Sequence, residues 1–310
     1  MKKLISIVTP TFNEEDNIKQ LCEAVSIELK KTDYEYEHII IDNSSTDNTT
    51  EILRDLAKKD KNIKVIINSR NFGHVRSPVY GLFQSKGEAA ILMMSDFQDP
   101  IELIPKYIEE WEKGYDVVLG QKNSSDENFI KHFVKKLFYK FAKRISDTPL
   151  LMNTTGSGLI DKKIIDVLKT IDDPYPYFRG LIPEITENIK LISYHQPKRI
   201  RGKTKNNFYT LYDLGILGII KHSKFPLRIM TFFGFIFSLL SLLVALAYLI
   251  FKLIYWDSFE LGVAPIIIGI FLLAFFQIFL SGFIGEYVMT ILTQSRKLPL
   301  IIEKERINFD

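Results

Sequence analysis

The stretch from Ile91 to Pro100, ILMMSDFQDP, leads from an apolar run into side chains that could carry chemistry. Asp96 and Gln98 are two residues apart, and residues at this spacing in an extended segment point to the same side. One carboxylate and one amide oxygen could then share a hard cation, because Mg²⁺ and Mn²⁺ prefer oxygen ligands and take the rest from water and phosphate. We therefore predict that Asp96 and Gln98 bind Mg²⁺ or Mn²⁺.

Asp99, in the same stretch, has a simpler explanation. In the sequence DPIE, Asp99 would be the N-cap of a helix, with Pro100 as its first residue and Glu102 as its third. This order is typical of a capping box with a first-turn proline. We therefore expect Asp99 to begin the next helix rather than to bind the metal.

A second acidic cluster, IDNSSTDNTTEIL, follows an apolar run in the same way. Thr46 or Asp47 can cap the helix that comes next. Asp42 comes too early to cap it and lies at the end of the expected strand. Acidic residues in related sheets hydrogen-bond a ribose, so we predict that Asp42 contacts the base or ribose of a nucleotide.

These side chains need a scaffold that brings them together, and the order of the apolar patterns predicts one. Apolar, β-branched runs alternate with helical patterns, which indicates a mostly parallel sheet with helices on both faces. Ligands of such sheets bind beyond the carboxyl ends of the strands, so the polar strand ends should converge on one rim. We expect strands at Leu4–Thr9, His38–Asp42, Ile63–Asn68, Ala89–Ser95 and Asp116–Gly120, and helices at Glu14–Lys31, Asp47–Lys59, Val75–Ser85 and Pro100–Lys113.

Composition argues against several other classes of protein. The net charge is +3 over 310 residues, which is no general bias toward nucleic acid, and we expect no nucleic-acid partner. Cys22 is the only cysteine in the sequence, which excludes an internal disulfide and a cysteine-based zinc site. No G-x-G-x-x-G follows the first apolar run, which argues against a dinucleotide site.

Two long uncharged stretches, Ile229–Phe251 and Leu261–Gly285, change the character of the chain after residue 206. Each exceeds the roughly 20 residues that cross a bilayer, so we predict two transmembrane helices; the alternative is a pair of buried core helices. Because basic flanks stay in the cytoplasm, we expect a multi-pass protein of the inner (cytoplasmic) membrane, with the first 200 residues and both termini cytoplasmic. The basic flanks are Lys221, Lys224 and Arg228 before the first stretch, and Arg296, Lys297, Lys304 and Arg306 after the second.

Four motifs, in this order and spacing, carry a resemblance to a known family. IVTPTFNEEDNI, IIIDNSSTDNT, SRNFG and SDFQDP resemble the sequences of glycosyltransferase family 2, whose members have the GT-A fold. The sequence KRIRGKTKNNFYTLYDLGILGIIKHSKFPLR, followed by two apolar stretches, is similar to that of the polyprenyl-phosphate glycosyltransferases. This group includes dolichol-phosphate mannose synthase and bacterial undecaprenyl-phosphate glucosyltransferases. The resemblance covers nearly the whole chain.

The resemblance implies an α/β GT-A catalytic domain, Rossmann-like with a mostly parallel sheet, followed by a C-terminal two-helix transmembrane region. We expect the domain over residues 1–205, a juxtamembrane interfacial helix over 206–228, two transmembrane helices within 229–293 and a cytoplasmic tail over 294–310. The resemblance also implies a homo-oligomer, and small residues in the apolar stretches suit close helix packing. These are Gly234, Ser238, Ser241, Gly269 and Ser281.

The implied reaction is an inverting transfer of a hexose from a UDP-linked nucleotide-sugar to a polyprenyl phosphate, undecaprenyl phosphate, at the inner membrane leaflet. Its product would be a lipid-linked sugar donor for cell-envelope glycosylation. The resemblance implies nucleotide binding by Pro10, Asn13, Glu14, Asp42 and Asp96, metal binding by Asp96 and Gln98, catalysis by Asp96, Arg199 and Arg201, and acceptor-phosphate binding by Arg179, Arg199, Arg201, Lys203 and Lys205.

The basic sequence RIRGKTK admits a second interpretation. It could form a juxtamembrane collar that only attracts anionic lipid, at about 1 kcal/mol per basic residue. We favour direct contact with the acceptor phosphate, because Arg binds phosphate bidentately. For Arg179, a packing role is an equal alternative. The helical spacing of apolar residues from Ile130 to Phe141 predicts either a second membrane-surface helix or an ordinary core-facing helix.

Four positions depart from the family pattern. Asn43 stands where a second acid is common, and Met94 stands where a D-x-D motif has its first acid. In TGSGL, Gly156 and Gly158 stand where an Asp and an Arg are often found. These departures motivate an alternative: a catalytically impaired membrane subunit that binds nucleotide or a partner transferase. A phosphate acceptor, however, is mostly a dianion at pH 7 and needs no general base, whereas the hydroxyl of another lipid acceptor would need one.

Overall fold

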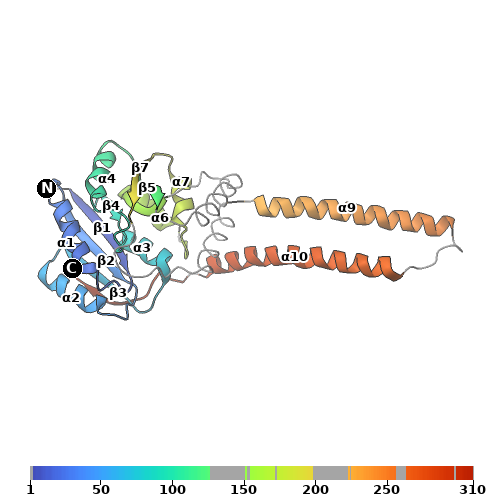
Figure 1. Cartoon of the computed structure of the whole chain (residues 1–310), viewed down its shortest axis with the longest axis horizontal. Coiled ribbons are helices and arrows are strands. Elements are labelled where there is room, and N and C mark those ends of the chain that lie inside the picture. The colour runs from blue at the N-terminus through green and yellow to red at the C-terminus, as the bar shows by residue number, and fades with distance from the viewer. Residues whose placement is uncertain are drawn as a thin grey trace.

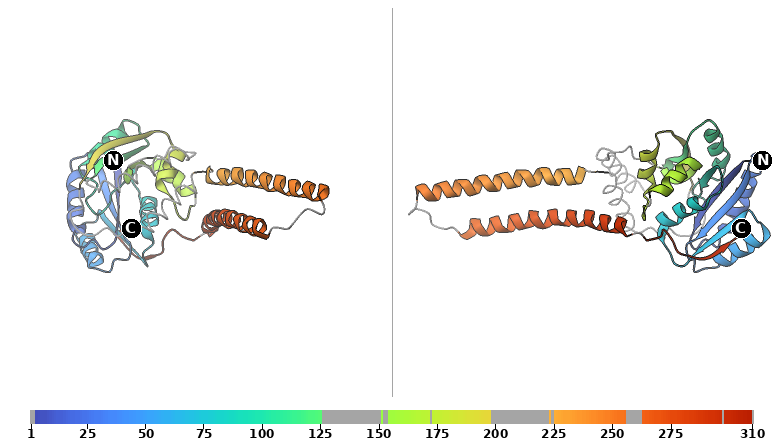
Figure 2. Two further views of the ribbon diagram at one scale, coloured as in Figure 1. Left: turned by 45° about the vertical axis from the view of Figure 1, so that its right-hand side comes forward. Right: turned by 180° about the vertical axis from the view of Figure 1, so that it is seen from behind.

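The computed structural model of the chain describes residues 3–125, 151, 154–171, 173–197, 223, 225–255, 263–296 and 298–309. Figure 1 shows an α/β domain from which two long helices extend side by side, and the two views in Figure 2 agree. The N-terminus lies on the side of the domain that faces away from these helices.

A central sheet of eight strands organises the domain. The strands are β1 (Leu4–Thr11), β2 (Glu35–Asp42), β3 (Ile63–Asn68), β4 (Ala89–Leu92), β5 (Val117–Ser125), β6 (Thr154–Asp161), β7 (Ile189–Gln196) and β8 (Glu303–Ile307). Their order across the sheet is β7-β5-β6-β4-β1-β2-β3-β8. β6 and β8 run antiparallel to their neighbours, and the remaining neighbouring pairs are parallel. The mostly parallel sheet predicted from the sequence is therefore confirmed.

Helices cover both faces of this sheet. One face carries α1 (Ile18–Leu29), α2 (Thr49–Lys59) and α4 (Leu103–Glu112), and the other carries α3 (Gly73–Gln84), α6 (Lys162–Thr170) and α7 (Phe178–Ile185). Successive strand residues point to opposite faces. Ile40 of β2 accordingly packs in the first core, whereas Ile39 and Ile41 pack in the second, and all three are fully buried.

The expected strands and helices lie in the expected order, but some ends differ. β4 ends at Leu92 rather than Ser95, because Leu92 is its last residue that pairs with β1 and β6. The chain then turns from Ser95, and Phe97 has φ +56°. The next helix begins at Leu103 rather than Pro100, because the chain first makes a separate turn, in which Leu103 N donates to Pro100 O at 3.1 Å. Both differences fall in the stretch that carries the predicted metal ligands.

Gly81 allows α3 to approach the sheet closely. A Cβ atom at this position would lie 2.5 Å from Val8 Cγ1 and 2.6 Å from Ile41 Cδ1, so a larger residue would force the helix outward. This close packing holds the second half of α3 against β1 and β2.

The two long helices are α9 (Phe225–Ile254) and α10 (Val263–Ser295). At 1.5 Å per residue they are about 45 Å and about 50 Å long, which is enough to cross a bilayer. Their apolar windows, Leu227–Val244 and Leu272–Ser295, have mean hydropathies of 2.1 and 1.6, and neither window is buried within the chain. Phe237 and Phe276 contact each other across the pair, with ring centroids 4.2 Å apart.

The chain after α10 returns to the domain as strand β8, which we did not predict from the sequence. β8 pairs antiparallel with β3 at the edge of the sheet, and Ser69 N donates to Ile302 O at 2.9 Å. Arg54 of α2 and Glu305 form an ion pair at 2.6 Å, and Tyr80 of α3 donates to Glu303 at 2.8 Å. The segment that follows α10 is therefore part of the central sheet.

We expect removal of residues 301–310 to destabilise the domain. The deletion takes away β8 and the side chain of Ile301, which is 5% exposed. Burying one such side chain stabilises a fold by about 1.5–3 kcal/mol, so the free energy of unfolding should fall by about 2 kcal/mol or more. Thermal unfolding of the purified protein in detergent measures this change. Lys304→Ala, at an exposed position of the same strand, is the control and should leave the midpoint unchanged. Equal midpoints for the deletion and the full chain would contradict the role of β8.

Candidate active site

The polar strand ends predicted from the sequence meet at one rim of the sheet. β1, β2, β3 and β4 are parallel, so their carboxyl ends lie at the same edge. β8 reaches β3 at this edge, because Asn68, the last residue of β3, pairs with Glu303, the first residue of β8. The rim therefore lies at the end of the domain that receives the chain from α10 (Figure 1).

The loops after β1 and β2 are joined by hydrogen bonds. Thr46 N donates to Asn13 Oδ1 at 2.8 Å, and Asn13 N donates to Ser45 Oγ at 2.9 Å. Glu14 N donates to Thr49 Oγ1 at 2.9 Å. Asn13 has φ +54°, a left-handed conformation that Asn tolerates better than most residues. Asn13 and Glu14, two of the predicted nucleotide-binding residues, thus lie where the loops after β1 and β2 are hydrogen-bonded to each other at the rim.

Asp42, at the end of β2, is fully buried. It accepts hydrogen bonds from Ser45 N at 3.2 Å, from Ser45 Oγ and from Thr50 Oγ1 at 2.9 Å. Burial raises the pKa of the Asp42 carboxyl above its ordinary value, and the hydrogen bonds from Ser45 and Thr50 act in the opposite direction. The carboxyl therefore braces the loop between β2 and α2, and its contact with a nucleotide remains a proposal.

The first turn of α2 is held by a side chain of the acidic cluster after β2, as the sequence predicted. α2 starts at Thr49, and Thr49 N donates to Asp47 Oδ1 at 3.0 Å. Asn48 occupies the N-cap position but makes no side-chain cap bond there. Asp47 therefore supplies the first-turn acceptor that the sequence predicted, from one residue further out.

Asn43, which replaces the acid common in the family, is a hydrogen-bond hub. Its Oδ1 accepts from Asn68 Nδ2 at 3.0 Å, from Phe72 N at 2.8 Å and from Ser77 Oγ at 3.1 Å. Its Nδ2 donates to Asn71 Oδ1 at 2.9 Å and to Gly73 O at 3.3 Å. The amide joins β2, β3 and the first turn of α3. An Asp at this position would lack the two N–H donors, so the departure from the family pattern fits its surroundings.

The premise used to pair Asp96 with Gln98 is wrong. These residues do not lie in an extended strand, because Phe97 between them has φ +56° and the chain turns. Gln98 N donates to Asp96 Oδ1 at 3.2 Å, which closes this turn. Both side chains are half-buried at the rim beyond β4. Asp96 and Gln98 can still share a cation, because the turn brings them close, but they do not share it as alternate residues of a strand.

The predicted N-cap role of Asp99 is also wrong. α4 begins at Leu103 with Glu102 at the N-cap, so Asp99 lies before the helix and not at its cap. Asp99 is 2% exposed and accepts a hydrogen bond from the hydroxyl of Tyr194 in β7. The sequence offered no local signal for Tyr194, because the partners are 95 residues apart.

The residues beyond β4 fit a divalent cation that also binds phosphate. Asp96 keeps a second carboxylate oxygen beyond the one that accepts from Gln98 N, and Gln98 offers an amide oxygen. No group of three His, Cys, Asp or Glu side chains suited to a metal occurs among the residues that the structure describes. Mg²⁺ is commonly bound by one or two carboxylates, with waters and substrate phosphates as the other ligands. The donor set suits a metal–diphosphate site rather than an all-protein metal site.

Gly156 and Gly158 of β6 are not equivalent. A Cβ atom at Gly158 would lie 2.2 Å from Val118 O, so the pairing of β6 with β5 excludes any side chain there. At Gly156, which has φ +90°, a Cβ atom would meet no atom of the described residues within 4 Å. β6 runs antiparallel to β4, and Gly158 pairs with Leu92 at the end of β4, so Gly156 lies further toward the turn that carries Asp96. Within the part of the chain that the structure describes, the rim therefore leaves room at Gly156, where the family often has an acid.

The other predicted site residues are placed only in part. Pro10 lies in β1 opposite Ile41 of β2, next to the rim. Arg179 is in α7, and its side chain is outside the description. Arg199, Arg201, Lys203 and Lys205 lie outside the described residues, as do the expected interfacial helix before residue 223 and the amphipathic stretch from Ile130 to Phe141.

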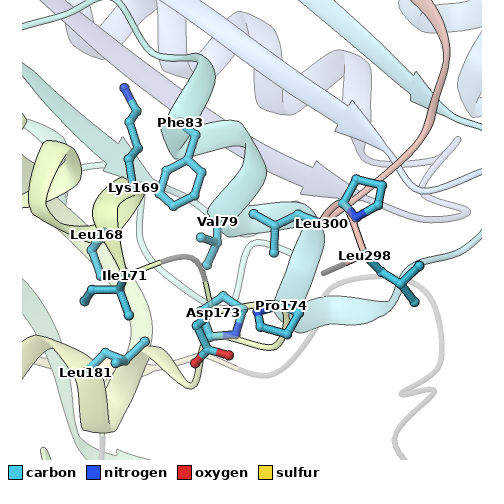
Figure 3. Close-up of a pocket in the computed structure, with 12 residues that line it drawn as sticks. Val79, Phe83, Leu168, Lys169, Ile171, Asp173, Pro174, Leu181, Leu298 and Leu300 are labelled. Atoms are coloured by element: carbon cyan, nitrogen blue, oxygen red, sulfur yellow. The ribbon is translucent and has the colours of Figure 1, made fainter. Parts of the chain in front are cut away.

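A small apolar pocket of about 90 Å³ lies between α3, α6, α7 and the segment after α10. Figure 3 shows Val79 and Phe83 of α3, Leu181 of α7 and Leu300 among its lining side chains. Ligand pockets are usually about 300–1,000 Å³, so this pocket is too small for a nucleotide-sugar. It belongs to the packing of the segment after α10 against the domain.

The mostly parallel sheet with a polar carboxyl-end rim is that of a GT-A glycosyltransferase. Residues 6–168 match the family described as Glycosyl transferase family 2, and the chain belongs to this family. It is 32% identical over 299 residues to an uncharacterized glycosyltransferase of Synechocystis sp., which covers 96% of this chain and 94% of that protein. It is 30% identical over 301 residues to a prophage bactoprenol glucosyl transferase homolog of Escherichia coli, which covers 97% of this chain and 98% of that protein.

A solved structure supports the fold. The crystal structure of glucosyl-3-phosphoglycerate synthase from Mycobacterium tuberculosis, in complex with Mn²⁺, uridine-diphosphate and phosphoglyceric acid, matches 70% of this chain and 76% of that chain. The TM-score is 0.50 and the sequence identity is 18%. The chain is therefore a glycosyltransferase with the GT-A fold.

We expect Asn43→Asp to destabilise the domain. The new carboxylate cannot donate to Asn71 Oδ1 or Gly73 O, and it would be charged at a position that is 6% exposed. A buried polar group left unsatisfied costs about 1–3 kcal/mol, so the free energy of unfolding should fall by about 2 kcal/mol or more. Denaturant unfolding of the purified protein measures this change.

The pH dependence and a matched control complete this test. Burial raises the pKa of the introduced carboxyl, so its neutral form is favoured in the folded state and the deficit should shrink as the pH falls. Asn62→Asp, in the exposed turn before β3, should change the free energy by less than about 0.5 kcal/mol. If Asn43→Asp is as stable as the parent and as Asn62→Asp, the hydrogen bonds of the Asn43 amide do not stabilise the domain.

Proposed function

We propose that this glycosyltransferase transfers glucose from a UDP-linked donor to a polyprenyl phosphate, undecaprenyl phosphate, at the inner membrane leaflet. The observation that carries the proposal is the length of the match to proteins named bactoprenol glucosyl transferase. The relatives of Escherichia coli and of a Shigella phage each align with 97% of this chain, so the match includes both apolar helices as well as the rim. A soluble acceptor would give no reason for the two helices.

The chemistry of the rim favours a phosphate acceptor over a lipid hydroxyl. A phosphate monoester is mostly a dianion at pH 7 and needs no base before it attacks. Gly156 offers no side chain where family members often have an acid, and no other described residue comes within 4 Å of its Cβ position. A hydroxyl acceptor would need a proton acceptor there. The proposed attack is by a phosphate oxygen on the anomeric carbon, with inversion and departure of UDP.

The rim residues bind and orient the donor in this proposal. Pro10, Asn13 and Glu14 lie in or beside the two hydrogen-bonded loops after β1 and β2. Asp42 fixes the second of these loops through Ser45. Asp96 and Gln98 would hold Mg²⁺ or Mn²⁺ against the diphosphate. When bound, such a cation neutralises charge that develops on the leaving diphosphate.

The acceptor phosphate is assigned to the basic segment after β7. Arg199, Arg201, Lys203 and Lys205 follow Gln196, the last residue of β7, and Arg179 is the further candidate in α7. Cations there would bring two anionic reactants together and orient the attacking oxygen. We place α9 and α10 across the inner membrane, with the catalytic domain and both termini in the cytoplasm. Homo-oligomers would bury part of their exposed apolar surface.

A catalytically impaired subunit is the second candidate. Met94, at the position of the first acid of a D-x-D motif, packs against the apolar core and supplies no oxygen ligand. Such a subunit would bind nucleotide without turnover. Incubating membranes with labelled UDP-sugars and undecaprenyl phosphate, and then recovering the lipid-linked sugar, separates the two candidates. Transfer from UDP-glucose supports the enzyme, and binding without product supports the subunit.

We expect Asp96→Asn to abolish metal-dependent donor binding and to lower transfer at least about 100-fold, which corresponds to about 2.7 kcal/mol in the transition state. The substitution removes the carboxylate charge but keeps the size of the side chain. UDP titrations in Mn²⁺ and in EDTA, together with the transfer assay, measure both effects. Asp55→Asn, on the exposed face of α2, is the control and should behave as the parent. Full activity of Asp96→Asn would remove Asp96 from the site.

We expect Arg199→Ala and Lys205→Ala to raise the apparent KM for polyprenyl phosphate about tenfold or to lower kcat, with little change in UDP affinity. The assay uses neutral detergent, so that attraction of anionic lipid cannot contribute. A collar that only attracts lipid would be rescued by more anionic membranes, and Arg199→Lys would then be silent. Normal turnover by both alanine variants in neutral detergent would refute direct contact with the acceptor phosphate.

A further inference from the structure

The turn that carries Asp96 and Gln98 is tied to a distant strand. Asp99, which ends this turn, accepts a hydrogen bond from the hydroxyl of Tyr194 in β7. β7 is three strands away from β4 in the sheet order. β5 and β6 lie between β4 and β7, so this bond anchors the turn beyond β4 to a strand that does not pair with β4.

The anchor is built into the interior of the domain. Asp99 is 2% exposed and Tyr194 is 7% exposed, so the bond is shielded from water. Tyr107 of α4, which is fully buried, lies against the same place. At Gly120 of β5, a Cβ atom would lie 2.6 Å from Tyr107 Oη and 2.9 Å from Tyr194 Cε1. The absence of a side chain at Gly120 gives both tyrosine rings their room.

The near end of the turn shows why the anchor matters. Phe97 lies in a left-handed conformation, which is unfavourable for a residue with a large side chain and persists only where the surroundings hold it. Gln98 N donates to Asp96 Oδ1 and fixes the local shape, but this bond does not fix the turn relative to the sheet. The bond from Tyr194 to Asp99 does so, one residue beyond Gln98.

We propose that Tyr194 is a positioning residue that holds Asp96 and Gln98 in place for the donor by fixing Asp99 to β7. This inference rests on the proposed role of these two residues at the metal site. Tyr194 also lies four residues before Lys198, where the basic stretch of the sequence begins. The tie therefore joins the turn of the donor site to the strand that leads into the segment assigned to the acceptor phosphate.

The test removes one hydroxyl and measures UDP binding at increasing Mn²⁺ concentration, using the full chain in detergent without acceptor. We expect Tyr194→Phe to raise the Mn²⁺ concentration for half-maximal UDP binding about tenfold. Tyr36→Phe is the matched control, because the Tyr36 hydroxyl donates to Ser26 Oγ at 2.9 Å in a part-buried place at the amino end of β2, opposite the rim. It should leave the Mn²⁺ midpoint unchanged, while the thermal unfolding midpoints of both variants fall by similar amounts.

Two further variants separate positioning from general stability. Asp99→Asn keeps an oxygen that can accept from the Tyr194 hydroxyl, so its Mn²⁺ midpoint should stay within about threefold of the parent. Asp99→Ala loses the acceptor and should behave like Tyr194→Phe. An unchanged Mn²⁺ midpoint for Tyr194→Phe, or an equal shift for Tyr36→Phe, overturns the proposal. So does UDP binding by the parent that needs no metal.

These outcomes are distinct from failure of the proposed reaction. If the parent binds UDP with Mn²⁺ but gives no lipid-linked glucose, the reaction is wrong, while a shifted midpoint for Tyr194→Phe still supports the positioning role. If the parent forms the product and Tyr194→Phe binds Mn²⁺ and UDP as the parent does, the reaction stands and the positioning role fails.

Discussion

A polar group at the end of a buried strand must find a hydrogen-bond partner, and the rim of this domain is organised by that requirement. Asn43 uses the oxygen and the nitrogen of its amide to join β2, β3 and α3. Asp42 accepts hydrogen bonds from the loop that leads into α2. Asp99 reaches across the sheet to Tyr194. These buried groups brace the loops from below. The half-buried Asp96 and Gln98 lie in the turn that Asp99 ties to β7.

The sequence predicted what depends on local pattern. Apolar runs placed the first four strands and the helices between them, because periodicity reports which residues face a core. The sequence could not predict the partners of Asp99 or the pairing of β8, because each depends on residues far away in the chain. Tyr194 is 95 residues from Asp99, and β8 pairs with a strand more than two hundred residues earlier. The false N-cap at DPIE shows the limit of local rules: the capping pattern was present, but the carboxylate had a buried partner elsewhere.

In the proposed reaction, the position of the rim relative to the long helices brings two unlike substrates to one edge. The chain that leaves α10 reaches the carboxyl end of β3 within a few residues, so the rim lies at the end of the domain nearest the helices. If α9 and α10 cross the membrane, a nucleotide-sugar dissolved in water can approach the loops after β1 and β2, whereas a lipid headgroup would reach the same edge from the side of the helices. In the proposed reaction, transfer needs no large movement of the domain, because the sheet itself defines the meeting place of donor and acceptor.

β8 also makes completion of the sheet depend on residues that are synthesised long after β3. Asn68 pairs with Glu303, so 235 residues separate the two strands in the chain. At roughly 5–20 residues per second, translation leaves the edge of β3 unpaired for about 12–47 s. An open strand edge is a site for aggregation. If both long helices insert, the segment after α10 returns to the side of the domain and closes this edge. A chain in which only one helix inserted would leave β8 on the far side of the membrane and the catalytic sheet unfinished, so assembly of the sheet would report that insertion is complete.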